Sequence, residues 1–500
     1  MEEPDIKGKS CKHQITSPVH NRDKKENDEE PASKKRLRYL KQVGLFFAAA
    51  MGHWNLGLSL SWPNTLASDL QMDNLTLFGT ELHLADWEMD MTSSMLFIGT
   101  LPGFVFGGWL VAWLGRRKSM MVLAIPASLG WMLIALAINS PMILLGRFIV
   151  GIAYALLGVA VRTYLVEISD TEIRGAAGLT TEVMKGIGAI GVTGLGMILP
   201  WYHLAFVSTC HIMIYGLLIV PFLPESPTYL LVKGKEDKAH QVLQYLRGKY
   251  ANLDEEMKQL KAKNECHTGK KGWRIIFKAD IIKKCSIVFG LFFISNFCGS
   301  EVIRANALRM LQTSGLSLDK DLSTIFIFVL LLSGNISQAL IIDRIGRRKC
   351  LALSLLLLMI AYAILGSYVF LQSQEIEVIH LLPEGNGTVP EEGISLTISK
   401  TWNWIPTVCL MSAAFSISLG IGPIPWMLSV EYFPTHIRSQ VMSVCTFIGN
   451  LMSFVALQIY SPLQVLLTPA GLYWSYSCFA LIGILYTILF VTETKGKRVG

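Results

Sequence analysis

One set of charged side chains occurs twice in the sequence, in the same order. The set consists of a Gly-Arg-Arg-Lys tetrapeptide, a glutamate followed seven residues later by an arginine, and a further glutamate in a short polar segment. Arginine binds a carboxylate through a planar fork, so these residue types form ion pairs that can be made and broken. We interpret them as a latch. Its residues are Arg116, Arg117, Glu167, Arg174, Glu225, Asp343, Arg347, Arg348, Glu431 and Arg438, with Glu493 in the second copy.

A second group of ionisable side chains lies inside apolar stretches. Glu182 and Lys185 are three residues apart, as are Glu301 and Arg304, so each pair shares a helix face. Helical geometry places Glu182 and Lys185 roughly 10 and 15 Å from the end of their helix. Charges at such depth are costly unless they face a partner or a cavity. Each pair is therefore either a self-neutralised packing contact or part of a solute site, and Arg304 has the further option of reaching the outer surface.

The stretches that hold these charges are long enough to cross a bilayer. Of the 500 residues, 52% are hydrophobic and only 16% are charged. This composition argues against a disordered chain, a typical soluble enzyme and a disulfide-rich scaffold. A membrane-spanning helix needs roughly 20 apolar residues. Twelve such runs are present, at 42–66, 90–112, 119–138, 142–164, 176–199, 204–223, 285–307, 322–342, 350–371, 404–430, 441–461 and 470–491.

Lysine and arginine predict how these helices are oriented. Both tetrapeptides, the link after the sixth run and the C-terminal residues are basic and fall on one side, whereas the loops at 67–90 and 372–403 are acidic. We therefore expect both termini in the cytosol, in a multi-pass protein of the plasma membrane. Asn74 and Asn386 lie in sequons of the two outer loops. These sequons either arise by chance or carry glycans.

The repeated charges follow equivalent helices in the two halves, which indicates a duplication. We expect an all-α membrane protein whose twelve transmembrane helices form two pseudo-symmetric bundles with a site between them. The predicted domains are a disordered cytosolic tail (1–41), an N-terminal six-helix bundle (42–223), a cytosolic linker with short helices (224–284), a C-terminal six-helix bundle (285–491) and a cytosolic C-terminal tail (492–500).

Other classes of function find no support in the sequence. It contains no Walker loop, nucleophile elbow or cysteine–histidine metal spacing. The basic residues do not form a stripe interleaved with exposed aromatics, which argues against nucleic-acid binding. We therefore expect no enzyme activity, metal or cofactor. The expected partners are a small polar solute and the lipid bilayer, around a monomeric protein.

Taken together, the motifs resemble those of the sugar porter family of the major facilitator superfamily. The tetrapeptides, the glutamate–arginine pairs, Gly146-Arg147-Phe148, the Pro-Glu-Ser-Pro segment 224–227 and the Gly-Pro-Ile-Pro-Trp segment 422–426 occur in the family's order over about residues 40–496. The first helix and the acidic outer loops look most like the facilitated trehalose transporter branch. The resemblance implies the twelve-helix major facilitator fold and transport by alternating access.

The resemblance also implies roles for individual residues. The latch charges of the two bundles would meet when the cytosolic side closes, although Ala112 stands where the family has an acid. Pro423 and Pro425 would break the tenth helix and form a gate. The family's substrate-binding pattern maps, with several substitutions, onto Glu182, Ser295, Asn296, Glu301, Trp426 and Asn450.

These observations lead to one functional hypothesis with open alternatives. We predict a carrier for trehalose or a hexose-like solute that works by rocker-switch alternating access. Ser59 stands where proton-coupled members have an aspartate, which favours facilitated diffusion. Proton-coupled transport remains the alternative if Glu182 or Glu301 titrates. The altered residues of the fifth and seventh helices equally suit a nutrient sensor that keeps the fold without transport.

Overall fold

The computed structural model describes residues 31–72, 75–248, 253–267, 279–314, 320–381, 402, 404–433 and 438–495. Regular structure in these ranges is helical, apart from one bridge between Leu75 and Glu81. Exposed large apolar side chains cover the outer faces of the helices, among them Phe106, Trp109 and Phe222. Such a surface suits lipid, because a soluble protein rarely exposes so many apolar side chains together.

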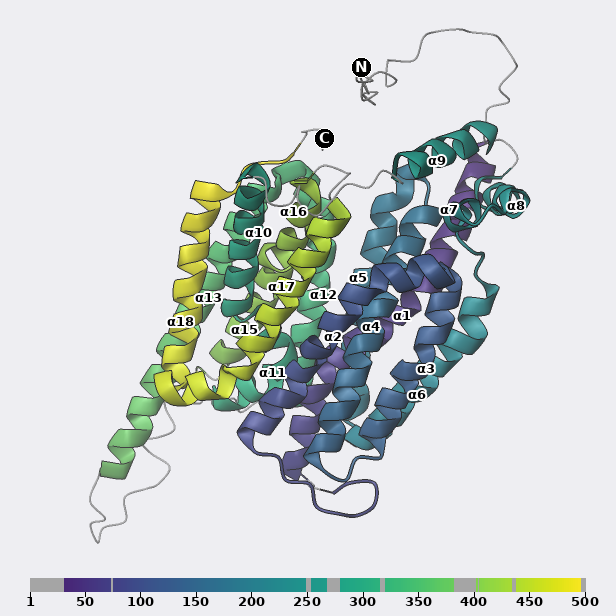
Figure 1. Ribbon diagram of the computed structural model, residues 1–500. Coiled ribbons are helices and arrows are strands. Elements are labelled where there is room, and N and C mark those ends of the chain that lie inside the picture. Colours follow the sequence, from purple (N-terminus) through teal and green to yellow (C-terminus); the bar gives the residue numbers. More distant parts are fainter. Residues whose placement is uncertain are drawn as a thin grey trace, which may run out of the picture.

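The first half of the chain forms one bundle (Figure 1, purple to blue). Its core is continuous and is built from buried residues between Phe46 and Leu246. Helix α4 shows how local sequence sets an element, since the Asn139 side chain accepts a hydrogen bond from the Met142 amide and Pro141 occupies the first turn. The helices are α1 (Ala32–Met72), α2 (Asp86–Leu114), α3 (Arg116–Ala135), α4 (Ser140–Ile168), α5 (Arg174–Gly196) and α6 (Trp201–Ile214), which continues as a π-helical turn, Tyr215–Ile219.

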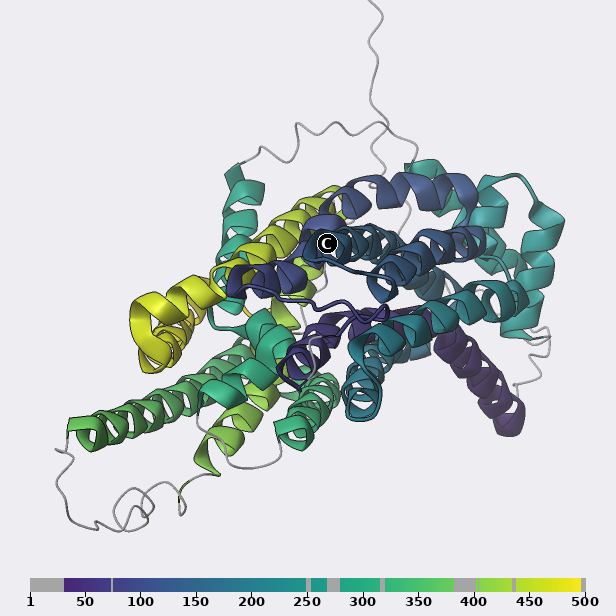
Figure 2. The ribbon, with the colours of Figure 1, turned by 90° about the horizontal axis from the view of Figure 1, so that it is seen from below.

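The second half forms a second bundle (Figure 1, green to yellow). Seen along the helices in Figure 2, the two bundles lie beside each other. The second core gathers mainly buried residues between Cys285 and Val491. Its helices are α10 (Ala279–Phe297), α11 (Ser300–Thr313), α12 (Lys320–Ile345), α13 (Arg347–Leu381), α15 (Ile405–Ser416), a π-helical turn (Ile417–Ile421), α16 (Ile424–Glu431), α17 (Arg438–Gln458) and α18 (Tyr460–Phe490).

The expected membrane spans agree with these helices, with two differences. Eleven helical segments among the described residues are long and apolar enough to cross a membrane. Helix α5 is not among them, because Glu182, Lys185 and its threonines and glycines lower its hydropathy. The run predicted at 285–307 is two helices, α10 and α11, since Gly299 adopts the left-handed region with φ 81°.

Two helices begin earlier than the predicted domain boundaries. Residues 32–41, which we expected in a disordered tail, form the start of α1, and α10 begins inside the predicted linker. The basic side chains of the early α1 turns have partners that hold them in a helix. Lys35 pairs with Glu172 at 3.0 Å, and Arg38 donates to the carbonyl oxygen of Arg247. Tyr39 also donates to Glu172, at 2.6 Å.

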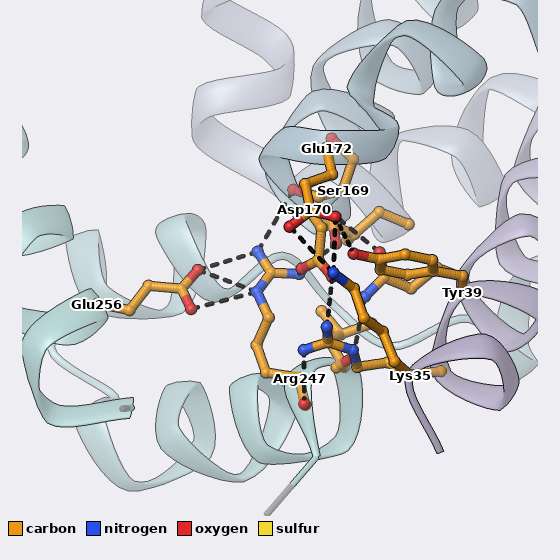
Figure 3. Close-up of polar contacts among 11 residues, drawn as sticks. Lys35, Tyr39, Ser169, Asp170, Glu172, Arg247 and Glu256 are labelled. Atoms are coloured by element: carbon orange, nitrogen blue, oxygen red, sulfur yellow. Dashed lines mark hydrogen bonds and ion pairs between the residues drawn. The ribbon is translucent and has the colours of Figure 1, made fainter. Parts of the chain in front are cut away.

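The linker helices pack against the end of the first bundle. They are α7 (Pro227–Val232), α8 (Glu236–Arg247) and α9 (Leu253–His267), at the end of the molecule where α1 begins and α18 ends (Figure 1). Arg247 joins them to the α4–α5 corner, because its guanidinium lies 2.7 Å from Asp170 and 2.9 Å from Glu256 (Figure 3). Arg247 is nearly buried and has two carboxylate partners, so it holds α8 and α9 firmly against the α4–α5 corner.

Candidate functional site

The first copy of the charged motif forms a compact cluster within the N-terminal bundle. The Arg116 guanidinium lies 2.6 Å from Glu167, and the other oxygen of Glu167 accepts a hydrogen bond from the Ser226 hydroxyl. Glu225 accepts from the backbone amides of Arg116 and Arg117, both at 3.2 Å. A carboxylate at this position satisfies amides that the first turn of α3 leaves without intrahelical partners.

The second copy repeats this arrangement in the C-terminal bundle. Arg347 lies 3.2 Å from Glu431, whose other oxygen accepts from the Thr494 hydroxyl at 2.5 Å. Glu493 accepts from the backbone amides of Arg347 and Arg348, at 3.0 and 3.1 Å. Each bundle therefore has an arginine–glutamate pair, a hydroxyl donor and a helix-capping glutamate in the same relation.

A glycine makes room for each capping carboxylate. Gly115 and Gly346 have φ values of 94° and 97°, in a region that residues with a Cβ adopt only under strain. A Cβ on Gly346 would lie 2.6 Å from Glu493, and one on Gly115 would lie 3.0 Å from Glu225. The glycine of each tetrapeptide is thus required by the glutamate that follows the last helix of the same bundle.

These ion pairs hold each bundle together and do not join the two. Among the described residues, the ion pairs at the end of the molecule that carries the linker helices stay within one bundle, including Asp343 with Arg347 at 2.9 Å. Arg348 donates to the carbonyl oxygen of Ile488 in its own bundle. Arg174 and Arg438 begin α5 and α17, but their side chains lie outside the described part of the chain. The cross-bundle latch therefore stays a prediction for another state of the protein.

The opposite end of the molecule carries direct contacts between the bundles. Asp90 of α2 is fully buried, and its carboxylate lies 2.7 Å from Arg309 of α11. The same carboxylate accepts from the backbone amide of Ser461, and Arg309 donates to the Ser461 hydroxyl at 2.8 Å. The Asn64 side chain donates to the carbonyl oxygen of Arg304 at 2.9 Å. These contacts join the two bundles at this end of the molecule.

Of the predicted solute-site residues, Glu182 belongs to the N-terminal bundle. It pairs with Lys185 at 2.5 Å, yet 42% of its side chain is exposed. Helix α5 packs on α1, and Gly57 brings the α1 backbone against the carbonyl oxygen of Lys185. Glu182 therefore lies about 12 Å along α5 from Arg174, the first residue of the helix, with part of its side chain exposed.

In the C-terminal bundle, Asn296 and Asn450 lie on neighbouring helices. The Asn296 amide oxygen accepts from Ser453 of α17 at 2.8 Å. Asn450 precedes Ser453 by three residues and donates to the carbonyl oxygen of Thr446 in its own helix. Ser295, beside Asn296, donates to Ser300 at 3.4 Å. Three of the predicted polar residues are therefore brought together where α10, α11 and α17 meet.

Trp426 of α16 packs against α10. Its ring packs edge-to-face on Phe292 of α10, with 4.6 Å between the ring centroids. The Asn296 side-chain amide donates a hydrogen bond to the backbone carbonyl oxygen of Phe292. An aromatic face next to amide groups is the combination that binds the C–H and O–H groups of a sugar.

Glu301 and Arg304 lie on the outer side of these residues. They pair at 2.5 Å, and the Arg304 side chain is only 18% exposed. Arg304 Nη2 would lie 3.3 Å from a Cβ on Gly422, so the guanidinium packs beneath the Gly-Pro-Ile-Pro-Trp segment. Arg304 therefore does not extend to the outer surface.

The helix break that we expected at Pro423 and Pro425 is a π-helical turn with substitute hydrogen bonds. The Gly422 amide bonds to the carbonyl oxygen of Ile417, five residues back. Pro423 has no N–H for the Leu419 carbonyl, and the Cys350 thiol donates to that oxygen instead. Ser354 accepts from the Ile421 amide at 3.0 Å. Side chains of α13 thus bond to backbone groups that the prolines and the π-helical turn leave without helical partners.

A family comparison identifies the class to which this architecture belongs. The model of the family described as sugar (and other) transporter matches residues 27–499. The chain belongs to the sugar transporter family of the major facilitator superfamily. Among solved structures, the inward-open xylose transporter XylE of E. coli has a TM-score of 0.71 at 18% identity and covers 91% of this chain and 98% of that one. This likeness confirms the expected twelve-helix fold.

Curated relatives of this sugar transporter family member match at moderate identity. The facilitated trehalose transporter of Apis mellifera ligustica is 28% identical over 464 residues, which is 92% of this chain and 87% of the relative. That of Bombyx mori is 28% identical over 455 residues, 90% of this chain and 84% of the relative. The family resemblance read from the motifs is therefore confirmed.

Three features of the candidate site were missed from the sequence. Asp90 and Arg309 come from helices 219 residues apart, and nothing local links them. The hydrogen bond from Asn64 of α1 to Arg304 of α11 could not be predicted for the same reason. Arg162 of α4 was overlooked because it follows a long apolar run without a neighbouring charge, although an arginine inside a membrane helix is itself a signal.

Proposed function

We propose that the protein carries a sugar, trehalose or a hexose-like solute, across the plasma membrane by rocker-switch alternating access. The observation that carries the proposal is the set of direct contacts that joins the two bundles at one end. Asp90, Asn64 and their partners join the outer ends, whereas the described ion pairs at the cytosolic ends stay within a bundle. A carrier open to one side at a time has this arrangement in its inward-facing state.

The solute would bind between the bundles at the predicted residues. Asn296, Asn450 and Trp426 supply amides and an aromatic face from one side, with Ser295 and Glu301 beside them. Glu182 of α5, in the other bundle, would complete the site, and 42% of its side chain is exposed. The relatives named as trehalose transporters support a sugar as the solute class, since trehalose offers many hydroxyl groups to such amides.

Facilitated diffusion is the mode that the first helix supports. Arg147 is buried and donates to the carbonyl oxygen and the hydroxyl of Ser59, at 2.7 and 2.9 Å. Where proton-coupled members have an aspartate, this chain thus has a hydroxyl already engaged with an arginine. A serine does not titrate in the physiological range, so it cannot couple solute movement to a proton.

The cytosolic latch and the chain's topology are part of the proposal. When the cytosolic side closes, the charges at the ends of α3, α4 and α13 would pair across the bundles, together with Arg174 and Arg438. Both termini and the linker helices would then lie in the cytosol. Asn74 and Asn386 would lie outside the cell, where they are available for glycosylation; both fall outside the described residues.

Uptake measurements on the purified protein test the proposal. Proteoliposomes are loaded with buffer and given labelled trehalose or glucose, with and without a pH gradient. Saturable uptake without the gradient, lowered at least tenfold in Asn296→Ala, supports facilitated sugar transport. Uptake that requires the gradient contradicts facilitated diffusion. Thermal stabilisation by a sugar without any flux contradicts transport and favours a sensor.

A further inference from the structure

A cationic side chain lies inside the membrane-spanning part of α4. Arg162 lies on α4, and its side chain is exposed although it is six residues before Ile168 at the helix end. Among the described residues its guanidinium has no hydrogen bond or ion pair. The carboxylate of Glu182 interacts with it electrostatically but pairs with Lys185. An unpaired arginine about 9 Å inside a membrane helix requires a water-filled cavity or a ligand.

Arg162 lies on the side of α4 that faces α1 and α5 of the same bundle. Gly158 and Ala155, which share its helix face one and two turns earlier, are buried in the protein. Arg162 also acts electrostatically on Glu182 of α5 and on His53 of α1, two helices of the same bundle. Its side chain therefore lies on the inner face, at about the depth of Glu182.

The local sequence turns the guanidinium towards the middle of the membrane. Side chains of a helix lean towards its N-terminus, and the N-terminus of α4 is its outer end. Gly158 has no side chain to oppose this, and Arg162 Nη2 would lie 3.6 Å from a Cβ placed on it. The cation thus reaches from the cytosolic third of the helix towards the proposed solute site.

The charges around this position do not cancel. Arg162 and Lys185 contribute two positive charges and Glu182 one negative charge, which leaves one positive charge on this wall of the pathway. His53 is nearly buried beside them, and both of its ring nitrogens lack hydrogen-bond partners among the described residues. One anionic group on the solute would neutralise the wall and give Arg162 a partner.

We infer that the preferred solute is a polyhydroxylated compound that carries one carboxylate, such as a hexuronate, and that Arg162 binds the carboxylate. The inference rests on the proposed function as a solute carrier and narrows its substrate class. In the inward-open state water solvates the guanidinium. When the pathway occludes, that water is removed, and an unpaired charge is then strongly unfavourable. A carboxylate on the solute removes this penalty, whereas a neutral sugar does not.

Paired uptake measurements test the inference. Proteoliposomes receive labelled D-glucuronate or D-glucose, which differ in having a carboxylate or a hydroxymethyl group at one carbon. We expect faster uptake of glucuronate by the native protein. Arg162→Gln should lower glucuronate uptake at least about tenfold, the range for losing a hydrogen bond to a charged group, and leave glucose uptake within about twofold. Arg162→Lys should retain part of the glucuronate uptake.

Two further arms separate binding from structural damage. Arg36→Gln removes an exposed cation of the first α1 turns and should leave both fluxes unchanged. Since glucuronate carries a charge, an inside-positive potential set by valinomycin and potassium should accelerate its uptake and leave that of glucose unaffected.

The outcomes distinguish the inference from the proposed function. Glucose uptake that equals or exceeds glucuronate uptake, an equal loss of both fluxes in Arg162→Gln, or glucuronate uptake insensitive to potential overturns the inference and leaves sugar transport standing. If the folded protein moves neither compound nor trehalose, the proposed function fails and the inference with it.

Discussion

Arg309 Nη1 and Asp90 Oδ1 lie 2.7 Å apart, although Asp90 belongs to α2 of the first bundle and Arg309 to α11 of the second. The carboxylate is fully buried, and the Arg309 guanidinium also lies over the ring of Tyr460, 5.2 Å from its centroid. No rearrangement can open the outer side without separating these two groups. The pair is therefore the outer counterpart of the latch that the sequence predicted for the cytosolic side.

Asp90→Asn should shift the protein towards an outward-open state. The substitution leaves Arg309 without its buried counter-charge, which costs about 3–5 kcal/mol when one member of such a pair is removed. A single cysteine at Gln458, which accepts from Ser94 of the other bundle, reports the opening. On a background with the native cysteines replaced by serine, an impermeant maleimide should label it from outside at least ten times faster than in the parent.

Asp86→Asn is the matched control for that measurement. Asp86 also approaches Arg309, at 3.6 Å, but its side chain is 88% exposed. Exposed ion pairs contribute about 0–1 kcal/mol, so labelling should change by less than about threefold. Equal labelling of Asp90→Asn and the parent would show that the outer pair does not hold this side closed.

Glu431→Gln should slow solute exchange across the membrane. Glu431 holds Arg347 and Thr494 in this state, and the latch hypothesis gives it a partner in the other bundle when the cytosolic side closes. Losing charge-assisted hydrogen bonds of about 1.5–3 kcal/mol predicts a roughly tenfold slower exchange with similar solute binding from outside. Arg438→Ala should act in the same way. Glu236→Gln, in the exposed ion pair with Lys261 of the linker helices, is the control and should exchange at the native rate.

Gly346→Ala should destabilise the protein. The residue has φ 97°, where a Cβ costs roughly 1–2 kcal/mol, and the new methyl group would meet Glu493 at 2.6 Å. Thermal unfolding in detergent should show a lower midpoint than the native protein. Gly44→Ala is the control, because a Cβ there meets nothing within 4 Å. Equal midpoints for the two variants would mean that the capping glutamate does not depend on the glycine.

The contribution of Glu493 to stability should depend on pH. Burial alone would raise the pKa of this carboxyl, but hydrogen bonds from the backbone amides of Lys495, Arg347, Arg348 and Thr494 together lower its pKa below the ordinary value. Because the folded pKa is the lower one, the stabilisation is complete above the ordinary glutamate pKa and is lost as the pH falls through the lowered value.

Thermal unfolding of the native protein and Glu493→Gln across this pH range checks the prediction. The native protein should unfold at a higher temperature at pH 7, and the difference should shrink as the pH approaches 4 and below. Glu236→Gln, in an exposed ion pair with Lys261, should match the native protein throughout. A difference that stays constant with pH would contradict the role of the ionised carboxylate.

The sequence predicted the fold well because a bilayer makes the signal strong. A helix that crosses it must be apolar over its whole length, so runs such as 142–164 stand out without any tertiary information. The charged repeats also predicted which helix ends are equivalent. They could not predict whether Arg116 pairs within its bundle or across it, because residue spacing does not specify the conformational state.

The outer contacts had no comparable signal. Asp90 and Arg309 each stand near a helix end, where single charges usually face water. Only their meeting across the bundles makes them distinctive, and a meeting of residues 219 apart follows from packing and not from periodicity. The π-helical turn was also unpredictable in detail, since the hydrogen bond from Cys350 to Leu419 needs α13 in place. The prolines marked the break but not how it is stabilised.

The contacts that join the two bundles at one end of the molecule have a kinetic consequence. A uniporter cannot concentrate its solute, whichever conformation it prefers. At equilibrium the solute concentration is the same on both sides of the membrane. A preference for the inward-facing form nevertheless makes the return of the empty carrier the slow step of net entry. Solute already inside would speed that return by occupying the carrier. Labelled solute should therefore enter loaded vesicles faster than empty ones, which is the behaviour known as trans-acceleration.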